Sequence, residues 1–116
     1  MLDINTAEEF VKSKNIKSIS ASQIRKFLAA VNKINNKVKY QNDNEVLSND
    51  IVDEIAYMRV QFAYIVGKNN TNEMKELYKK LDPAMAEIKT SKAAFINFAR
   101  YVEAIIAYHK FHGGKD

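Results

Sequence analysis

The chain has 116 residues, of which 47% are hydrophobic and 28% charged, with one Pro, three Gly and no Cys. This composition excludes collagen-like, low-complexity and disulfide-stabilised proteins, and also thiol enzymes and zinc fingers. The length favours a single domain over residues 1–116 that buries enough surface for a stable core. No apolar run approaches the roughly 20 residues of a membrane span and no segment resembles a signal peptide, so we expect a cytoplasmic location.

Charge is distributed unevenly along the chain. The formal net charge is +4, and it divides into +5 over residues 1–40, −3 over 41–82 and +2 over 83–116. A positive surface would attract a polyanion such as nucleic acid. Opposed positive and negative surfaces on one molecule would favour head-to-tail contact between copies. Chance variation among solvated helix faces would give the same distribution, so charge alone leaves both interpretations open.

Apolar residues recur at steps of three and four along most of the chain, without the alternation typical of a β-strand. This period predicts an all-α fold: a compact bundle of about five helices, without a sheet, whose core spans about 20–112. A short N-terminal helix at about 5–14 is indicated by Thr6 and Glu9, which have the spacing of a capping box.

The first long helix begins at Ser20 or Ser22, with Ser22 as its predicted N-cap, and the polar run at 41–44 ends it. The second begins near Ser48, and Gly67 is its expected C-terminal stop. The predicted inward residues are Ile24, Phe27, Leu28, Val31, Ile34 and Val38 in the first helix and Ile51, Ile55, Met58, Phe62 and Val66 in the second.

Two further helices are predicted in the second half of the chain. One runs from about 71 to 81 and ends before Pro83, because the residue preceding a proline is disfavoured in the helical region. Pro83 then suits the first turn of a brief helical segment through 88. The last helix spans about 91–111 and is terminated by a Gly-Gly pair at 113. Its predicted inward residues are Phe95, Phe98, Ala99, Val102, Ile105, Ile106 and His109.

Candidate catalytic groups are few. His109 and His112 stand three residues apart, a spacing that can place two imidazoles on one side of a helix. No carboxylate lies within the same turn and His109 falls on the apolar stripe, so a hydrogen-bonded core histidine is favoured over a metal ligand or a ribonuclease base. The carboxylates at 50, 53 and 54 are explained by the start of a helix. We therefore expect no enzyme, no catalytic residue, no cofactor and no metal site.

The basic residues give the stronger signal. On the first long helix, Lys26, Lys33 and Lys37 fall at steps of seven and four and form one stripe, with Arg25 on the adjacent flank. With the asparagines interleaved among them, these cations suit a polyanionic backbone bound without sequence preference. A solvated helix face has the same pattern and stays the alternative.

Two arginines and the tyrosines each allow two interpretations. Arg59 lies at the edge of the buried face of its helix, and Arg100 precedes Glu103 by three residues, so Glu103 could pair with either. Each arginine holds a carboxylate of the bundle or contacts RNA. The tyrosines could stack on bases or fill a protein interface. They are Tyr57, Tyr64, Tyr78, Tyr101 and Tyr108.

Several short motifs, in their order and spacing, resemble the small subunit of type III-A CRISPR effector complexes, the Csm complexes. The similarity covers the chain from about Ser22 to its end, whereas residues 1–19 and 39–49 carry no match. The motifs are QIRKFL at 23–28, VN at 31–32, MRV at 58–60, AY at 63–64, GK at 67–68, FARYVEA at 98–104 and AYHKFHGGKD at 107–116.

The resemblance implies a helical bundle that stacks in several copies as a minor filament of a prokaryotic, RNA-guided antiviral ribonucleoprotein. The implied partners are target RNA, guide RNA, neighbouring copies, the large polymerase-like subunit, the repeated backbone subunits and the capping subunit, with cleavage left to other subunits. With the stripe residue Lys37 included, the predicted RNA-binding residues are Arg25, Lys26, Lys33, Lys37, Arg59, Lys68, Arg100 and Lys110. The alternative is a helical protein-interaction module without RNA contact.

Overall fold

A computed structural model describes residues 2–41 and 46–114 of the chain. The elements in order are η1 (Ile4–Thr6), α1 (Ala7–Ser13), η2 (Ile16–Ser18), α2 (Ala21–Tyr40), α3 (Asn49–Lys68), α4 (Asn72–Ile88) and α5 (Lys92–Phe111), where η denotes a 3-10 turn. Within the described ranges the predicted all-α fold is confirmed, since the one β-type contact is an isolated bridge between Val46 and Ser91. Residues 42–44 of the polar run and the last two motif residues lie outside these ranges.

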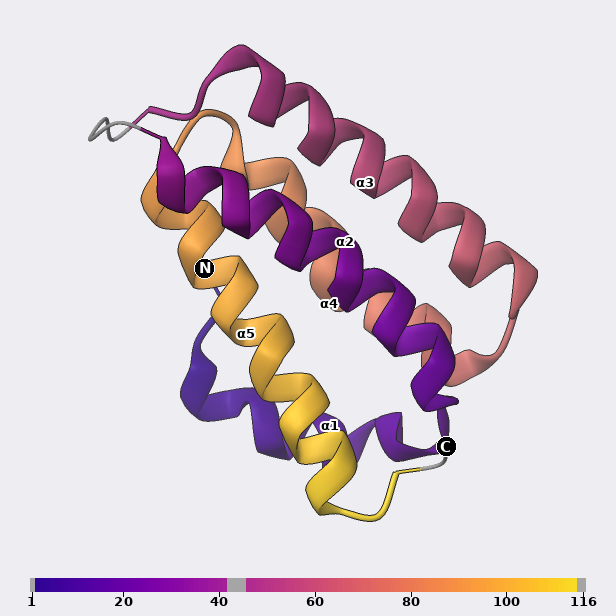
Figure 1. Ribbon diagram of the computed structural model, residues 1–116. Coiled ribbons are helices and arrows are strands. Elements are labelled where there is room, and N and C mark those ends of the chain that lie inside the picture. The colour runs from indigo at the N-terminus through magenta and orange to yellow at the C-terminus, as the bar shows by residue number, and fades with distance from the viewer. Residues whose placement is uncertain (1, 42–45, 115–116) are drawn as a thin grey trace.

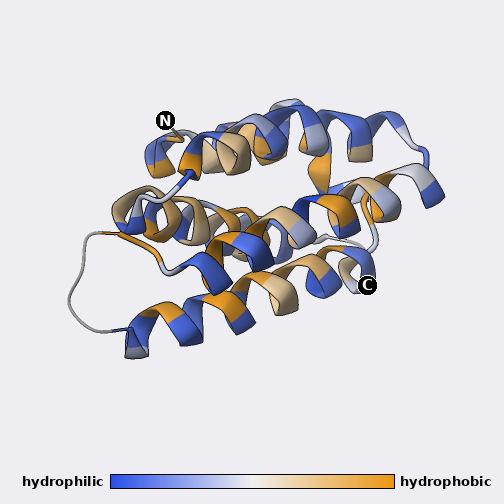
Figure 2. Ribbon diagram, turned by 90° about the horizontal axis from the view of Figure 1, so that it is seen from above, coloured by the Kyte–Doolittle hydropathy of each residue, from blue (hydrophilic) through white to orange (hydrophobic). Residues whose placement is uncertain are grey.

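Helices α2 to α5 form an antiparallel bundle (Figure 1). Both α2 and α4 pack against α3 and α5, so α2 and α4 lie diagonally opposite each other. The short helix α1 packs on α5 towards the end where the described chain finishes. Apolar and polar segments alternate along each helix, as burial of one side requires (Figure 2). No helix of the described ranges is long and apolar enough to cross a membrane.

The core is built from one buried stripe on each long helix. The predicted inward residues of α2, α3 and α5 are all buried apart from Leu28 and Ile106, which are partly buried and still pack against the core. Tyr101 is buried as well, although the periodicity did not place it inward. The helical period therefore predicted most of the buried residues. The opposite faces of α2 and α3 are exposed to solvent and are available for binding.

Serine residues occupy the capping positions of α2, α3 and α5, and Thr71 occupies that of α4, with one difference from prediction. The Ser48 hydroxyl accepts a hydrogen bond from the Ile51 amide at 3.4 Å, which confirms it as the cap of α3. The predicted cap Ser22 is wrong, because Ser20 occupies the capping position of α2. The two hydroxyls bond each other at 2.9 Å, so the side chain of Ser22 is used locally.

The predicted capping box at the N-terminus is also wrong. Thr6 precedes α1, but its hydroxyl donates to the Asp3 carbonyl oxygen at 2.7 Å and caps no amide of the helix. The Asp3 carboxylate accepts from the Asn5 amide at 2.9 Å and caps the preceding turn η1. The Thr6 hydroxyl, which a capping box would have used, is thus bound to the 3-10 turn instead.

Helix α4 runs through Pro83, contrary to the predicted break. An interior proline costs about 3 kcal/mol, because it removes one helical hydrogen bond and crowds the preceding turn. Leu81, Met85 and Ile88 continue the buried stripe across the proline, and each buried side chain contributes about 1.5–3 kcal/mol. Burial on both sides of Pro83 therefore outweighs its local preference.

The end of α3 differs from prediction as well. Gly67 lies inside the helix, and Asn69 occupies the capping position after Lys68. The Asn69 side-chain amide donates to the Ile65 carbonyl oxygen at 2.8 Å, and its backbone amide donates to the same oxygen at 3.1 Å. Because Asn69 satisfies a terminal carbonyl, a left-handed glycine is not needed there.

Candidate nucleic-acid interface

The outward face of α2 is cationic over its whole length. The helix contains five Lys or Arg residues and no Asp or Glu. Arg25, Lys26, Lys33 and Lys39 are exposed, because the inward stripe leaves them on the opposite arc of the helix. None of these four pairs with a carboxylate that the structure describes. The predicted stripe is therefore present as a surface, and Lys39 adds a cation that the prediction left out.

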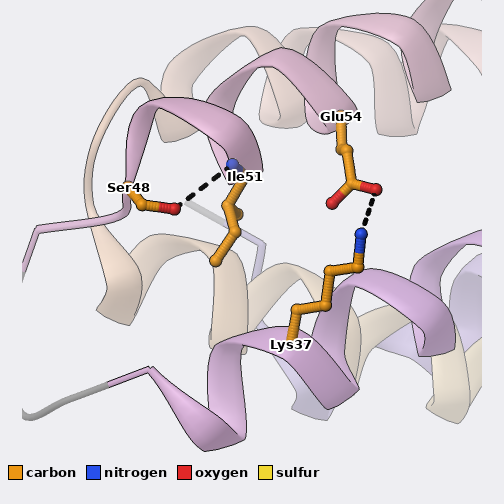
Figure 3. A network of polar contacts seen from close by, with 4 residues as sticks. All are labelled: Lys37, Ser48, Ile51 and Glu54. Carbon is orange, nitrogen blue, oxygen red and sulfur yellow. Dashed lines mark hydrogen bonds and ion pairs between the residues drawn. The ribbon is translucent and has the colours of Figure 1, made fainter.

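Lys37 belongs to the same stripe but is held by α3. Its ammonium lies 2.6 Å from one carboxylate oxygen of Glu54 (Figure 3). The second oxygen of Glu54 is buried and has no hydrogen-bond partner among the described residues. The Lys37 side chain keeps 51% exposure, so it remains at the surface while its ammonium is paired with Glu54.

Arg59 faces α4 and is bound within the bundle. Its Nε donates to one carboxylate oxygen of Asp82 at 3.0 Å, and its Nη2 donates to the other oxygen at 3.1 Å. Hydrogen bonding to Asp82 raises the pKa of Arg59 above its ordinary value, despite partial desolvation. The expected partner Glu103 is therefore wrong for Arg59, because the planar guanidinium group of Arg59 binds both carboxylate oxygens of Asp82 on α4.

Breaking this pair should lower stability. We expect Asp82→Asn to reduce the free energy of unfolding by about 1 kcal/mol, because a two-point contact is lost at a half-exposed site. Urea denaturation measures the change. Arg100→Gln is the matched control, since Arg100 is exposed and has no carboxylate partner in the described chain. Equal losses in both variants would show that the contact between Arg59 and Asp82 adds nothing.

The remaining predicted cations lie on different surfaces. Lys68 is exposed at the end of α3, next to Asn69, whose side chain contacts Gln23 at the start of α2. It therefore lies at the same end of the bundle as Arg25 and Lys26. Arg100 and Lys110 are exposed on α5, and Arg100 does not pair with Glu103 in the part of the chain described. The structure thus gathers the cations of α2 and Lys68 and leaves those of α5 apart.

An open groove of about 520 Å³ lies between α2 and α3 at the surface, beside the cationic face of α2. Lys26 and Ala30 line it from α2, and Tyr57, Gln61 and Tyr64 line it from α3. The sequence marked the tyrosines and the lysine separately. These side chains line the same groove because α2 packs beside α3. The helical period of a single helix does not predict which helix packs beside it.

The two histidines bind other parts of the chain. The buried His109 donates from Nε2 to the Ile19 carbonyl oxygen at 2.7 Å, as predicted for a core histidine. His112 places Nε2 2.8 Å from a carboxylate oxygen of Glu8 on α1. No group of three His, Cys, Asp or Glu side chains in the described ranges is arranged to hold a metal ion.

Comparison with known proteins places the chain in a family. The family model described as Csm2 Type III-A matches residues 2–115. The Streptococcus thermophilus protein named CRISPR system Cms protein Csm2 is 35% identical over 100 residues, covering 84% of this chain and 76% of the relative. A protein of the same name from Enterococcus italicus is 31% identical over 128 positions, covering 97% and 90%. A third, from Mycobacterium tuberculosis, is 29% identical over 105, covering 90% and 84%. The chain therefore belongs to the Csm2 Type III-A family of CRISPR proteins, which supports its assignment as a subunit of a type III-A effector complex.

Proposed function

We propose that this chain is a non-catalytic small subunit that holds the phosphate backbone of target RNA, and of its duplex with the guide, on the outward face of α2. One observation carries the proposal: α2 presents Arg25, Lys26, Lys33 and Lys39 to solvent and contains no carboxylate. Cations on a polyanion release its counterions, and this effect supplies binding that does not depend on base sequence. Such contacts suit a subunit that must accept any target.

The proposal leaves bond cleavage to other subunits. Of the two histidines, the buried His109 contacts the Ile19 carbonyl oxygen and the partly exposed His112 contacts Glu8. These contacts give each histidine a structural use, which supports a role in binding rather than chemistry.

We further propose that copies stack as a minor filament, beside repeated backbone subunits and between the large polymerase-like subunit and the capping subunit, in the prokaryotic cytoplasm. One copy offers few phosphate contacts. Tethering several copies raises the effective concentration of each site along one RNA strand, so the filament binds more tightly than its parts.

The test is the salt dependence of single-stranded RNA binding by the full chain. Each phosphate neutralised contributes about −0.7 to the log–log slope for single strands. Lys26→Gln/Lys33→Gln should therefore flatten the slope by about 1.4 and weaken binding at low salt.

The matched control is Lys12→Gln/Lys75→Gln, which removes the same charge from exposed positions on α1 and α4. This control should keep a slope close to that of the wild type. Equal flattening by both double variants would assign the effect to net charge and contradict a site on α2.

A second candidate function is a protein-interaction module without RNA contact. The exposure of Tyr57, Val60 and Tyr64 on α3, between 63% and 69%, favours it. Crosslinking within an assembled complex separates the two candidates. Links from α2 to RNA support the first, and links to protein alone support the second.

A further inference from the structure

The groove between α2 and α3 has the composition of a base-binding site. Its volume of about 520 Å³ lies in the range of small-molecule sites, about 300–1,000 Å³. Tyr57 and Tyr64 line one side together with the aliphatic Val60 and Ile65, Lys26 and Ala30 line the other, and Gln61 adds an amide. No carboxylate lies among the groove's described lining residues. An aromatic surface beside a cation, without a competing acid, is the combination that single-stranded nucleic acid recognises.

The two tyrosines are placed for stacking rather than for the core. These two residues are 63% and 69% exposed, whereas the intervening Phe62 is 1% exposed and fills the interior. Seven residues of helix separate them, about 10.5 Å along the axis, so both rings leave α3 on the same side. Bases in a strand stack about 3.4 Å apart, so this length matches about three stacking steps.

We propose that this groove receives unpaired bases of a single RNA strand, stacked on Tyr57 and Tyr64, while Lys26 contacts an adjoining phosphate. This inference rests on the proposed RNA binding and adds a second mode to it, base stacking beside backbone neutralisation. Because every base has an aromatic face, the groove adds affinity for unpaired nucleotides without choosing a sequence.

Charge favours RNA over a protein helix as the occupant. The groove opens beside the cationic face of α2, where Arg25, Lys26 and Lys33 stand exposed without a described partner. An RNA strand would neutralise these cations with its phosphates and at the same time place its bases next to the two tyrosines. A partner helix would leave these charges unmatched unless it carried a matching row of acids.

The experiment compares two probes of equal charge on the full chain at about 50 mM salt. One is an oligoadenylate of about 12 nucleotides, within the site sizes of single-strand binders, and the other is an abasic ribose-phosphate oligomer of the same length. Tyrosine fluorescence reports stacking directly, because the chain has no Trp. The variant is Tyr57→Leu/Tyr64→Leu, and Tyr40→Leu is the control, because Tyr40 is 88% exposed and lies outside the groove.

Wild type and Tyr40→Leu should bind the oligoadenylate roughly tenfold more tightly than the abasic oligomer. The double variant should lose this preference and keep the salt slope. Salt-dependent binding without base preference in the wild type would overturn the groove proposal and leave the proposed function standing. Absence of salt-dependent binding in the wild type would overturn both. A double variant with unchanged preference for bases that fails to join the other complex subunits would make the groove a protein interface.

Discussion

Replacing Phe62 by alanine should lower the free energy of unfolding by about 3–5 kcal/mol. Phe62 is 1% exposed on α3, and its ring stacks on Phe27 of α2 with centroids 4.2 Å apart. It also contacts the ring of Tyr78 on α4 at 5.5 Å. The variant therefore loses both the burial of a large side chain and the contacts that join three helices, and the cavity left behind collapses only in part. Urea denaturation at neutral pH measures the loss.

The matched control is Tyr64→Ala, two residues further along the same helix. Tyr64 is 69% exposed, so its removal should change stability by no more than about 0.5 kcal/mol. The pair separates the two faces of α3, one holding the bundle and one facing the groove. A large loss in Tyr64→Ala, or a small loss in Phe62→Ala, would show that α3 is rotated relative to this description.

The helices were predictable because each amphipathic stripe is a local pattern. In α3, Ile51, Ile55, Met58 and Phe62 follow the helical period, and burial of that face stabilises the helix wherever its neighbours lie. Periodicity therefore locates the interior without any knowledge of topology. The motifs of the family could also be recognised from the sequence, since they depend on residue identity and spacing alone.

The ends of the helices were predicted less well, because Pro and Gly indicate only the conformation that each residue prefers locally. Pro83 predicts a break, yet the buried stripe continues through it. Gly67 predicts a stop, yet Asn69 supplies the terminal hydrogen bonds two residues later. In both cases tertiary burial or a neighbouring side chain contributes more than the local preference of one residue.

The candidate site was predictable as a stripe but not as a set of partners. Exposure of Lys26 and Lys33 follows from their positions on α2. The partners of Lys37 and Arg59 lie on other helices, at Glu54 and Asp82, so the spacing within one helix could not find them. Contact of any of these cations with RNA stays a prediction.

His109 joins the end of α5 to the N-terminal segment. It is 3% exposed and donates from Nε2 to the carbonyl oxygen of Ile19, which is itself buried. The backbone amide of Gly114 donates to the carbonyl oxygen of His109 at 2.7 Å, and a Cβ at Gly114 would clash with the imidazole ring of His109. The imidazole is thus enclosed by the chain before α2 and the chain after α5.

We expect His109→Ala to reduce the free energy of unfolding by about 2–4 kcal/mol, because it opens a cavity and leaves a buried carbonyl without a donor. Protection of the amides of η2 and α1 from hydrogen exchange should fall with it. His109→Gln, whose amide can donate to the same oxygen, should recover part of the loss. His112→Ala is the control, since its contact with Glu8 is partly exposed and should contribute less than about 1 kcal/mol. If His109→Ala kept full stability, this enclosed imidazole would have no structural reason to be there, and a chemical role for it would return to consideration.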